Sequence, residues 1–294
     1  MSDQPQTRIG FFLALGVTSF AFAPILVRTA DFADPVALAT LRTVSAALIL
    51  LPFWLWYRLR GQIESYQSKD MQRAFWAGAS LGLHFILWIA ALNLTSVASA
   101  SVLVTMHPII LILIESRFMG QRFGAMVWGG VLLAFSGTVL LAVSDGLFAS
   151  DFEHALLGDF LAVMAACMFV VYFLISRELR QRSNWLNYVF WVYAFTAITC
   201  VAAAFITSAE FRWDSAFVFA GVGLAIGPQI IGHGSFNFSV KYISPTVLST
   251  LILSEPVFAT LLALMFFAEM PPLFSFFSMA LILIGVFIAW KGRS

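Results

Sequence analysis

The sequence carries ionisable side chains inside long apolar stretches, and two of them stand directly before a proline. Glu255 precedes Pro256 in "LSEP", and His107 precedes Pro108 in "MHP". A carboxyl or an imidazole can contact a solute or carry a proton, and a proline inside a helix frees a backbone carbonyl for a ligand or water. We therefore interpret both positions as substrate or coupling sites with a helix kink. The alternative is a paired, structural group at that kink.

His84 and Trp88 are four residues apart, so on a helix they share one face. Histidine changes its charge near neutral pH, and tryptophan offers an aromatic wall with one N–H donor. The pair predicts part of a cavity wall that stacks against a substrate or hydrogen-bonds to it. The alternative is a histidine satisfied by a neighbouring helix.

His233 and Asn237 repeat this spacing in a segment that is interrupted by Gly227-Pro228 and by further glycines. Interrupted apolar segments are typical of binding sites in transporter folds. Gln229, in the same segment, is a weaker candidate. The alternative is that the glycines only allow helices to pack closely.

Arg42 lies inside an apolar stretch, about 6–9 Å from its outer end by helical rise. It can extend its charge outward, pair with a carboxylate such as Glu255, or gate a substrate. Glu115 and Arg117 lie at the other end of their stretch, where an interfacial ion pair or a topology signal is expected.

The sequence contains no pattern that indicates an enzyme, a metal site or a cofactor. Cys167 and Cys200 have no metal-ligand or disulfide spacing, and no phosphate-binding glycine loop precedes a basic residue. The net charge of +1 gives no reason to expect a nucleic-acid partner. We expect no cofactor and no metal.

Composition explains why these residues stand in apolar surroundings. Of the 294 residues, 61% are hydrophobic and only 11% are charged, against about 25% charged in an ordinary soluble domain. Runs of about 20 apolar residues cross a bilayer as helices, because backbone polar groups must be satisfied internally there. The sequence predicts an all-α integral membrane protein with ten transmembrane helices, in chain order 9–27, 36–57, 73–92, 98–118, 124–144, 157–176, 185–208, 215–238, 246–267 and 272–290.

The loop charges predict the orientation of these spans. With a cytoplasmic N-terminus, thirteen of the sixteen lysines and arginines fall on the cytoplasmic side, and only Arg28 and Arg212 fall outside. We expect both termini in the cytoplasm and a location in the inner membrane.

The two halves of the chain match each other after a shift of 148 residues. Pro108 then falls on Pro256, Gly137 falls on Gly285, and "GFFLA" falls on "GDFLA" without a gap. Each half, 1–148 and 149–294, holds five spans, so the second five-helix repeat crosses the membrane in the opposite sense. Two inverted repeats in one compact membrane domain are typical of secondary transporters.

Two stretches in particular, "LHFILWIAALNLTSVASASVLVTMHP" and "PQIIGHGSFNFSVKYISPTVLSTLILSEP", resemble the EamA-type transporters of the drug/metabolite transporter (DMT) superfamily. The resemblance covers essentially the whole chain. It implies a central cavity lined by the first, third, fourth, sixth, eighth and ninth spans, with Pro24 and Tyr172 as weak lining candidates. It also implies that the fifth and tenth spans, which contain Gly129, Gly130, Gly137 and Gly285, give structural support.

These observations favour a secondary active transporter of a small organic metabolite, either amino acid-like or amphipathic. It would work by alternating access, with export implied by the family resemblance. Either a proton gradient acting through Glu255 and a histidine or the substrate's own gradient would drive it. A monomer in the lipid bilayer would suffice. The alternatives are an integral-membrane enzyme acting on a lipid and a structural or sensor subunit.

Overall fold

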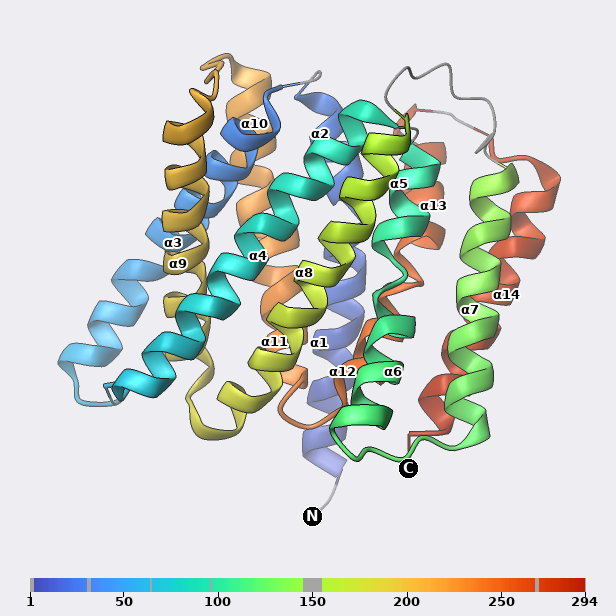
Figure 1. Ribbon diagram of the computed structural model, residues 1–294, viewed down its shortest axis with the longest axis horizontal. Coiled ribbons are helices and arrows are strands. Elements are labelled where there is room, and N and C mark those ends of the chain that lie inside the picture. The colour runs from blue at the N-terminus through green and yellow to red at the C-terminus, as the bar shows by residue number, and fades with distance from the viewer. Residues whose placement is uncertain are drawn as a thin grey trace. The chain divides into compact units, whose positions relative to one another are not determined.

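The computed structural model describes residues 3–30, 33–63, 65–95, 97–144, 155–267 and 270–293. Regular structure in these ranges is helical, as expected for an apolar chain whose backbone must satisfy itself. The helices of Figure 1 are α1 (Asp3–Ala21), α2 (Ala23–Thr29), α3 (Pro35–Leu59), α4 (Ser68–Leu94), α5 (Val97–Val104), α6 (His107–Phe118), α7 (Ala125–Ser144), α8 (Ala155–Arg182), α9 (Trp185–Thr207), α10 (Ser215–Leu224), the π-helix η1 (Ala225–His233), α11 (Gly234–Ser239), α12 (Pro245–Ile252), α13 (Glu255–Phe267) and α14 (Leu273–Lys291).

These helices form the ten predicted spans. Eight stretches of the described chain are long and apolar enough to cross a membrane, and α7 and the α5–α6 pair supply the other two. The predicted limits differ most at α1, α4 and α8, which begin or end several residues beyond 9–27, 73–92 and 157–176. Charged residues such as Asp70 and Arg180 mark the end of the apolar run, but they do not end the helix. Helices continue past the hydrocarbon wherever the sequence favours them.

The predicted kinks at the two prolines are complete helix breaks. In the fourth span α5 ends at Val104 and α6 begins at His107; in the ninth, α12 ends at Ile252 and α13 begins at Glu255. Each proline is the second residue of the new helix, where its missing N–H breaks no helical hydrogen bond. The two halves therefore share a break at matching positions.

The chain folds into two compact units that do not coincide with its halves. Unit 1 comprises Met1–Ile89 and Val171–Tyr242, and unit 2 comprises Ala90–Val170 and Ile243–Ser294. Each unit thus contains helices from both repeats. The boundary between the repeats at residue 148 falls outside the described residues and stays a prediction.

In unit 1, helices α3 and α9 lie along each other (Figure 1). The Trp54 indole stacks on the Phe190 ring with 4.4 Å between centroids, and its N–H donates to Asn187 Oδ1 at 2.9 Å. Nearer the other end, Thr40 Oγ1 donates to the carbonyl of Cys200 at 3.1 Å. These contacts fix α3, which carries Arg42.

In unit 2, helices α7 and α14 pack backbone against backbone at a glycine seam, formed by Gly130, Gly137 and Gly285. A Cβ atom on Gly130 would lie 2.4 Å from the amide nitrogen of Ala289, and one on Gly285 would lie 2.3 Å from that of Ala134. The small residues let two helices approach without a polar contact. Figure 1 shows the pair running side by side.

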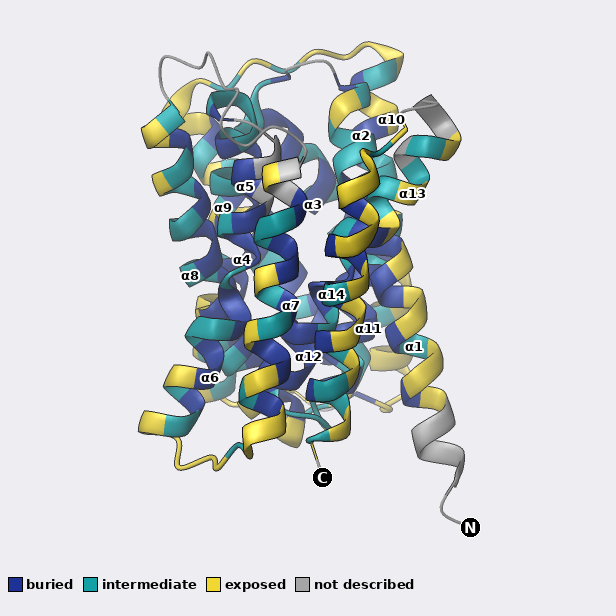
Figure 2. Cartoon of the chain, turned by 90° about the vertical axis from the view of Figure 1, so that its right-hand side faces the viewer, coloured by how far each residue is buried: buried dark blue, intermediate teal, exposed yellow. Residues whose placement is uncertain are grey.

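The outer surface of α14 is apolar, as a lipid-facing helix requires. Figure 2 shows exposed and buried residues alternating along this helix. Its buried face holds Ser278, Ile282 and Gly285, whereas Phe277 and Phe287 are more than half exposed. A large exposed apolar area is costly in water and favourable in lipid.

Candidate functional site

The eighth span contains a π-helical segment in its middle. Pro228 lies inside η1 and has no N–H to donate to the carbonyl four residues earlier, so one α-helical hydrogen bond is missing there. The N–H of Gly234 reaches back to the carbonyl of Gln229, five residues away, which is the π-helical hydrogen bond. Single π-helical turns are frequent at functional sites. The sequence indicated an interruption here but not its type.

Three polar side chains follow each other along this segment, and we call Gln229, His233 and Asn237 the polar ladder. Gln229 and Asn237 are completely buried, and His233 is 6% exposed. The predicted i, i+4 pair His233 and Asn237 thus extends by one further step to Gln229, which sequence reasoning ranked lower. All three belong to unit 1.

Arg42 contacts the first member of the ladder. Its Nε donates to Gln229 Oε1 at 3.1 Å, and its guanidinium carbon lies 3.7 Å from the centroid of the Phe85 ring. Arg42 is 2% exposed, so it does not extend its charge to the surface. The structure joins it to the candidate site through Gln229. The pairing of Arg42 with Glu255 that the sequence suggested stays a prediction.

Aromatic rings surround His233 in the middle of the ladder. The ring centroids of Phe20, Phe85 and Tyr172 lie 4.7, 5.3 and 6.0 Å from that of the imidazole. Phe20 can approach because Gly232 has no side chain: a Cβ atom there would lie 2.7 Å from the phenyl ring. The rings make an apolar wall around one titratable group.

Two tyrosines donate hydrogen bonds to the ladder, one at each end. Tyr172 Oη donates to Asn237 Oδ1 at 2.7 Å, and Tyr193 Oη donates to the carbonyl of Gln229 at 2.6 Å. Both tyrosines are buried. Tyr172 was only a weak candidate from the sequence, and Tyr193, Phe20 and Phe85 were not candidates, because no local spacing ties them to the eighth span.

Two hydrogen-bond donors in this ladder have no acceptor in the described part of the chain, namely Gln229 Nε2 and Asn237 Nδ2. A buried polar group without a partner costs about 1–3 kcal/mol. Each such group needs an explanation, and a ligand or an ordered water is the usual one.

His84 and Trp88 lie on α4 as predicted, on one face of the helix. His84 is buried, and Trp88 is half-buried. The residue of α4 that contacts both Arg42 and His233 is Phe85, next to His84. The role of His84 and Trp88 as part of a cavity wall stays a prediction.

His107 and Glu255 begin helices α6 and α13 in unit 2. His107 is 4% exposed, and its ring lies 4.5 Å from that of Phe169 on α8. Glu255 is half-buried. Both ionisable groups therefore sit at helix breaks, where the backbone is not fully bonded within its own helix.

Glu115 is a buried structural group rather than an interfacial one. Its Oε2 accepts hydrogen bonds from the Thr246 amide at 2.8 Å and from the Thr246 hydroxyl at 2.5 Å, at the start of α12. A carboxylate at a helix N-terminus satisfies free N–H groups and complements the helix dipole. Arg117, two residues on, is exposed.

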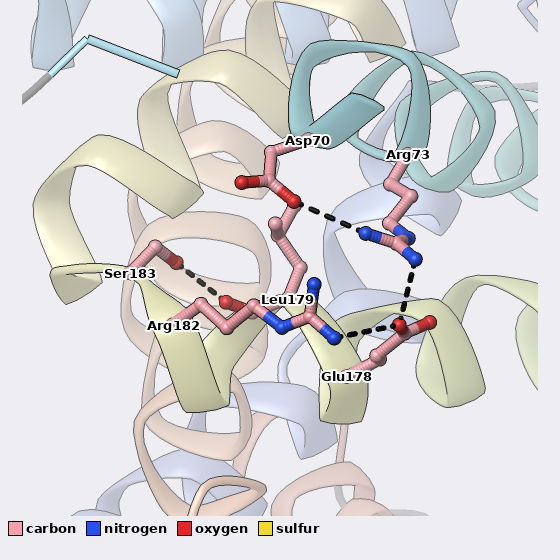
Figure 3. A network of polar contacts seen from close by, with 6 residues as sticks. All are labelled: Asp70, Arg73, Glu178, Leu179, Arg182 and Ser183. Atoms are coloured by element: carbon pink, nitrogen blue, oxygen red, sulfur yellow. Dashed lines mark hydrogen bonds and ion pairs between the residues drawn. The ribbon is translucent and has the colours of Figure 1, made fainter. Parts of the chain in front are cut away.

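A surface network joins the first turns of α4 to the end of α8 (Figure 3). Arg73 bridges Asp70 at 3.2 Å and Glu178 at 2.9 Å, and Arg182 also reaches Glu178. These side chains are between one-fifth and three-fifths exposed, and exposed ion pairs contribute about 0–1 kcal/mol each. The network is suited to holding two helix ends together and has no features of a binding site.

Comparison with known proteins identifies the family. The model of the EamA-like transporter family matches twice, at residues 8–143 and 156–290. The chain is 24% identical over 204 residues to an "Uncharacterized transporter" of Archaeoglobus fulgidus, covering 69% of this chain and 71% of that protein. It is 22% identical over 272 residues to "Uncharacterized transporter YdfC" of Bacillus subtilis, covering 92% and 86%.

A solved crystal structure has the same fold, with a TM-score of 0.76 at 20% identity, over 97% of this chain and 99% of the other. The family is one of transporters and not of enzymes, so the alternative of a lipid-modifying enzyme is set aside. The chain is a multi-pass membrane protein with two EamA repeats. It belongs to the EamA-like transporter family of the drug/metabolite transporter superfamily.

Proposed function

We propose that this transporter is a secondary active transporter that moves a small organic metabolite by alternating access and binds it at the polar ladder. The observation that carries the proposal is the combination of two buried donors without acceptors, Gln229 Nε2 and Asn237 Nδ2, with an aromatic wall around His233. A few convergent polar groups within apolar surroundings are typical of small-molecule sites.

In this proposal, the helix breaks at His107 and Glu255 couple substrate movement to the driving gradient. Each combines a titratable group with a helix N-terminus, a combination that alternating-access transporters use for ions and charged groups. A proton gradient acting through Glu255 and a histidine is one driving force, and the substrate's own gradient is the other. The inverted repeats allow the two halves to exchange conformations around the site.

We propose export across the inner membrane, with both termini in the cytoplasm, on the strength of the loop charges and the family. A reporter fused within residues 145–156 tests the topology. The sequence places this segment between the two proposed repeats, and a periplasmic signal is expected. A cytoplasmic signal would overturn the orientation.

The function is tested by uptake into proteoliposomes with a panel of labelled small metabolites, with and without an imposed pH gradient. Saturable flux is expected, and Glu255→Gln should abolish its response to the gradient. Arg117→Ala is the matched control, because Arg117 is exposed and lies outside the proposed site. Absence of flux for every solute would contradict the transport proposal. Unchanged pH dependence in Glu255→Gln would remove only its coupling role.

A further inference from the structure

We infer that the first turns of α1 carry a binding site for one anionic phospholipid, with the lipid phosphate at Arg8 and its acyl chains in an adjoining groove. The groove has a volume of about 620 Å³ and is lined by Arg8, Phe11, Phe12 and Phe238. It lies on α1 and α11, which both belong to unit 1, and it shares no residue with the polar ladder. The inference concerns a ligand from the membrane and does not depend on the proposed function.

The groove continues the contact between α1 and α11 toward the start of the chain. A Cβ atom on Gly16 would lie 2.9 Å from the Phe236 ring, so the two helices touch there. About one turn nearer the start, the rings of Phe12 and Phe238 meet with 4.7 Å between centroids. Arg8 comes four residues before Phe12, on the same face of α1, and there the groove opens.

By its sequence position, the groove lies at the boundary between lipid headgroups and hydrocarbon. The membrane-length apolar stretch that includes most of α1 begins at Arg8. Phe12 lies roughly 6 Å further along the helix, so the rings are on the hydrocarbon side of the charge. The ring of Tyr242, which is 53% exposed, lies 5.7 Å from that of Phe238. A tyrosine at this level is typical of the membrane interface.

The positive charge at the mouth of the groove is available to a ligand. Arg8 is exposed and forms no hydrogen bond or ion pair within the part of the chain that the structure describes. A guanidinium binds a phosphate through two parallel hydrogen bonds. Lys241, just beyond the end of α11 and three residues after Phe238, adds a second positive charge. Among the described residues, no acidic side chain lines the groove.

These features select an anionic phospholipid over other occupants. A free phosphate would bind the guanidinium but would not cover the three phenyl rings. A neutral alkyl chain would cover the rings but would not pair with the charge. A zwitterionic lipid carries an ammonium close to its phosphate, which cancels most of the attraction to Arg8. An anionic lipid matches both halves of the groove, because basic residues at the membrane surface attract anionic headgroups.

Native mass spectrometry of the delipidated full chain tests the site by counting bound lipids. The protein in neutral detergent is titrated with phosphatidylglycerol, with phosphatidylcholine that has the same acyl chains, and with glycerol 3-phosphate. One phosphatidylglycerol should bind about fivefold more tightly than phosphatidylcholine, the factor for one basic residue at an anionic headgroup. Equal affinity for the two lipids, or glycerol 3-phosphate that binds as tightly as phosphatidylglycerol, would overturn the assignment.

Arg8→Gln should lower the affinity for phosphatidylglycerol to that for phosphatidylcholine, because it removes the group that pairs with the phosphate. Arg8→Lys retains the charge and should keep part of the preference. The matched control is Arg122→Gln, which removes the same charge from an exposed position between α6 and α7 and should bind like the parent protein. Both arginines are exposed, so all three variants should fold. An unchanged lipid preference in Arg8→Gln would sink the proposal.

Phe11→Ala tests the apolar half of the site. It should weaken the binding of both lipids severalfold and preserve the preference for phosphatidylglycerol, because Phe11 contacts only the acyl chains in this proposal. Phe205→Ala, at a position on α9 that is 82% exposed, is the matched control and should change neither affinity. A dimer that forms without lipid and is lost in Phe11→Ala would show that a second copy of the chain covers the groove, which would contradict the lipid site.

Discussion

The polar ladder in unit 1 and the glycine seam in unit 2 both lie inside helices of membrane length, but they fill their surroundings in opposite ways. At the seam, the backbones of α7 and α14 are so close that no side chain fits at Gly130 or Gly285. At the ladder, side chains are large and polar, and two amide donors remain open. Both regions are buried, so burial alone does not mark a site.

The difference lies in what each region leaves unsatisfied. The seam is complete by itself, because small residues exchange only van der Waals contacts and backbone groups stay bonded within each helix. The ladder is complete only when a ligand or water is added. Substitutions at the seam should therefore affect folding, and substitutions at the ladder should affect transport.

The largest effect is expected at the seam. In Gly285→Val the new side chain would meet the backbone of Ala134, which cannot move aside as a flexible side chain could. Folded protein should be lost from the membrane, as measured by fluorescence-detected size-exclusion chromatography.

The control for this substitution is Gly129→Ala, on the partner helix α7. A Cβ atom at Gly129 has no neighbour within 4 Å, so this variant should accumulate like the parent protein. If both glycine variants accumulated equally, the two helices could not be packed as described.

Substitutions in the polar ladder should reduce transport and leave the amount of folded protein unchanged. His233→Leu keeps an apolar side chain among Phe20, Phe85 and Tyr172, so the fold should survive. The loss of its polar ring should lower flux into proteoliposomes by about tenfold or more, the factor for one hydrogen bond. Normal flux, or protein that no longer folds, would remove the contrast with the seam.

Glu115 sharpens the comparison, because it is buried and charged but already satisfied by Thr246. Glu115→Ala should cost roughly 2–3 kcal/mol of stability by leaving the buried amide and hydroxyl of Thr246 without their acceptor. Transport per folded molecule should not change. The midpoint of thermal unfolding and the flux, measured on the same sample, separate the two effects. A loss of flux without a loss of stability would assign Glu115 to the transport path.

The smallest effect is expected at the start of α3, the helix that carries Arg42. Asp34 caps this helix by accepting hydrogen bonds from the amides of Val36 and Ala37 at 2.8 and 3.0 Å. Asp34→Ala should lower stability by about 1 kcal/mol. Asp34→Asn keeps the cap and should lose little. Equal losses in the two variants would mean that charge rather than capping matters there.

Local sequence signals predicted the spans and the two breaks well. Hydropathy is a property of one segment, and a proline acts on its own helix, so Pro108 and Pro256 could be read directly. The partners of the ladder could not be predicted in this way. Phe85 and Tyr193 reach it from α4 and α9, and only packing brings those helices to the eighth span.

The composition of the two compact units could not be predicted from local sequence signals either. The sequence divides naturally into two halves, but each unit combines helices of both. Hydropathy and internal repetition describe the order of spans along the chain and carry no information on which spans pack together. Hydropathy and internal repetition could not predict the π-helical form of η1 either. Pro228 predicts an interruption of the helix but does not specify the backbone conformation that results.

The π-helical turn determines the angular phase of the ladder. Four residues of an α-helix rotate about 40° beyond a full revolution, so three side chains at this spacing would drift steadily around an ordinary helix. The step from Gln229 to His233 lies in the wider η1, where four residues fall short of a revolution, and the next step enters α11. The two angular deviations from a full revolution have opposite signs and cancel, so Gln229 and Asn237 point in nearly the same direction. Deleting one residue from η1 would turn everything beyond it by about 100°, so the number of residues in this turn sets where the side chains of α11 point.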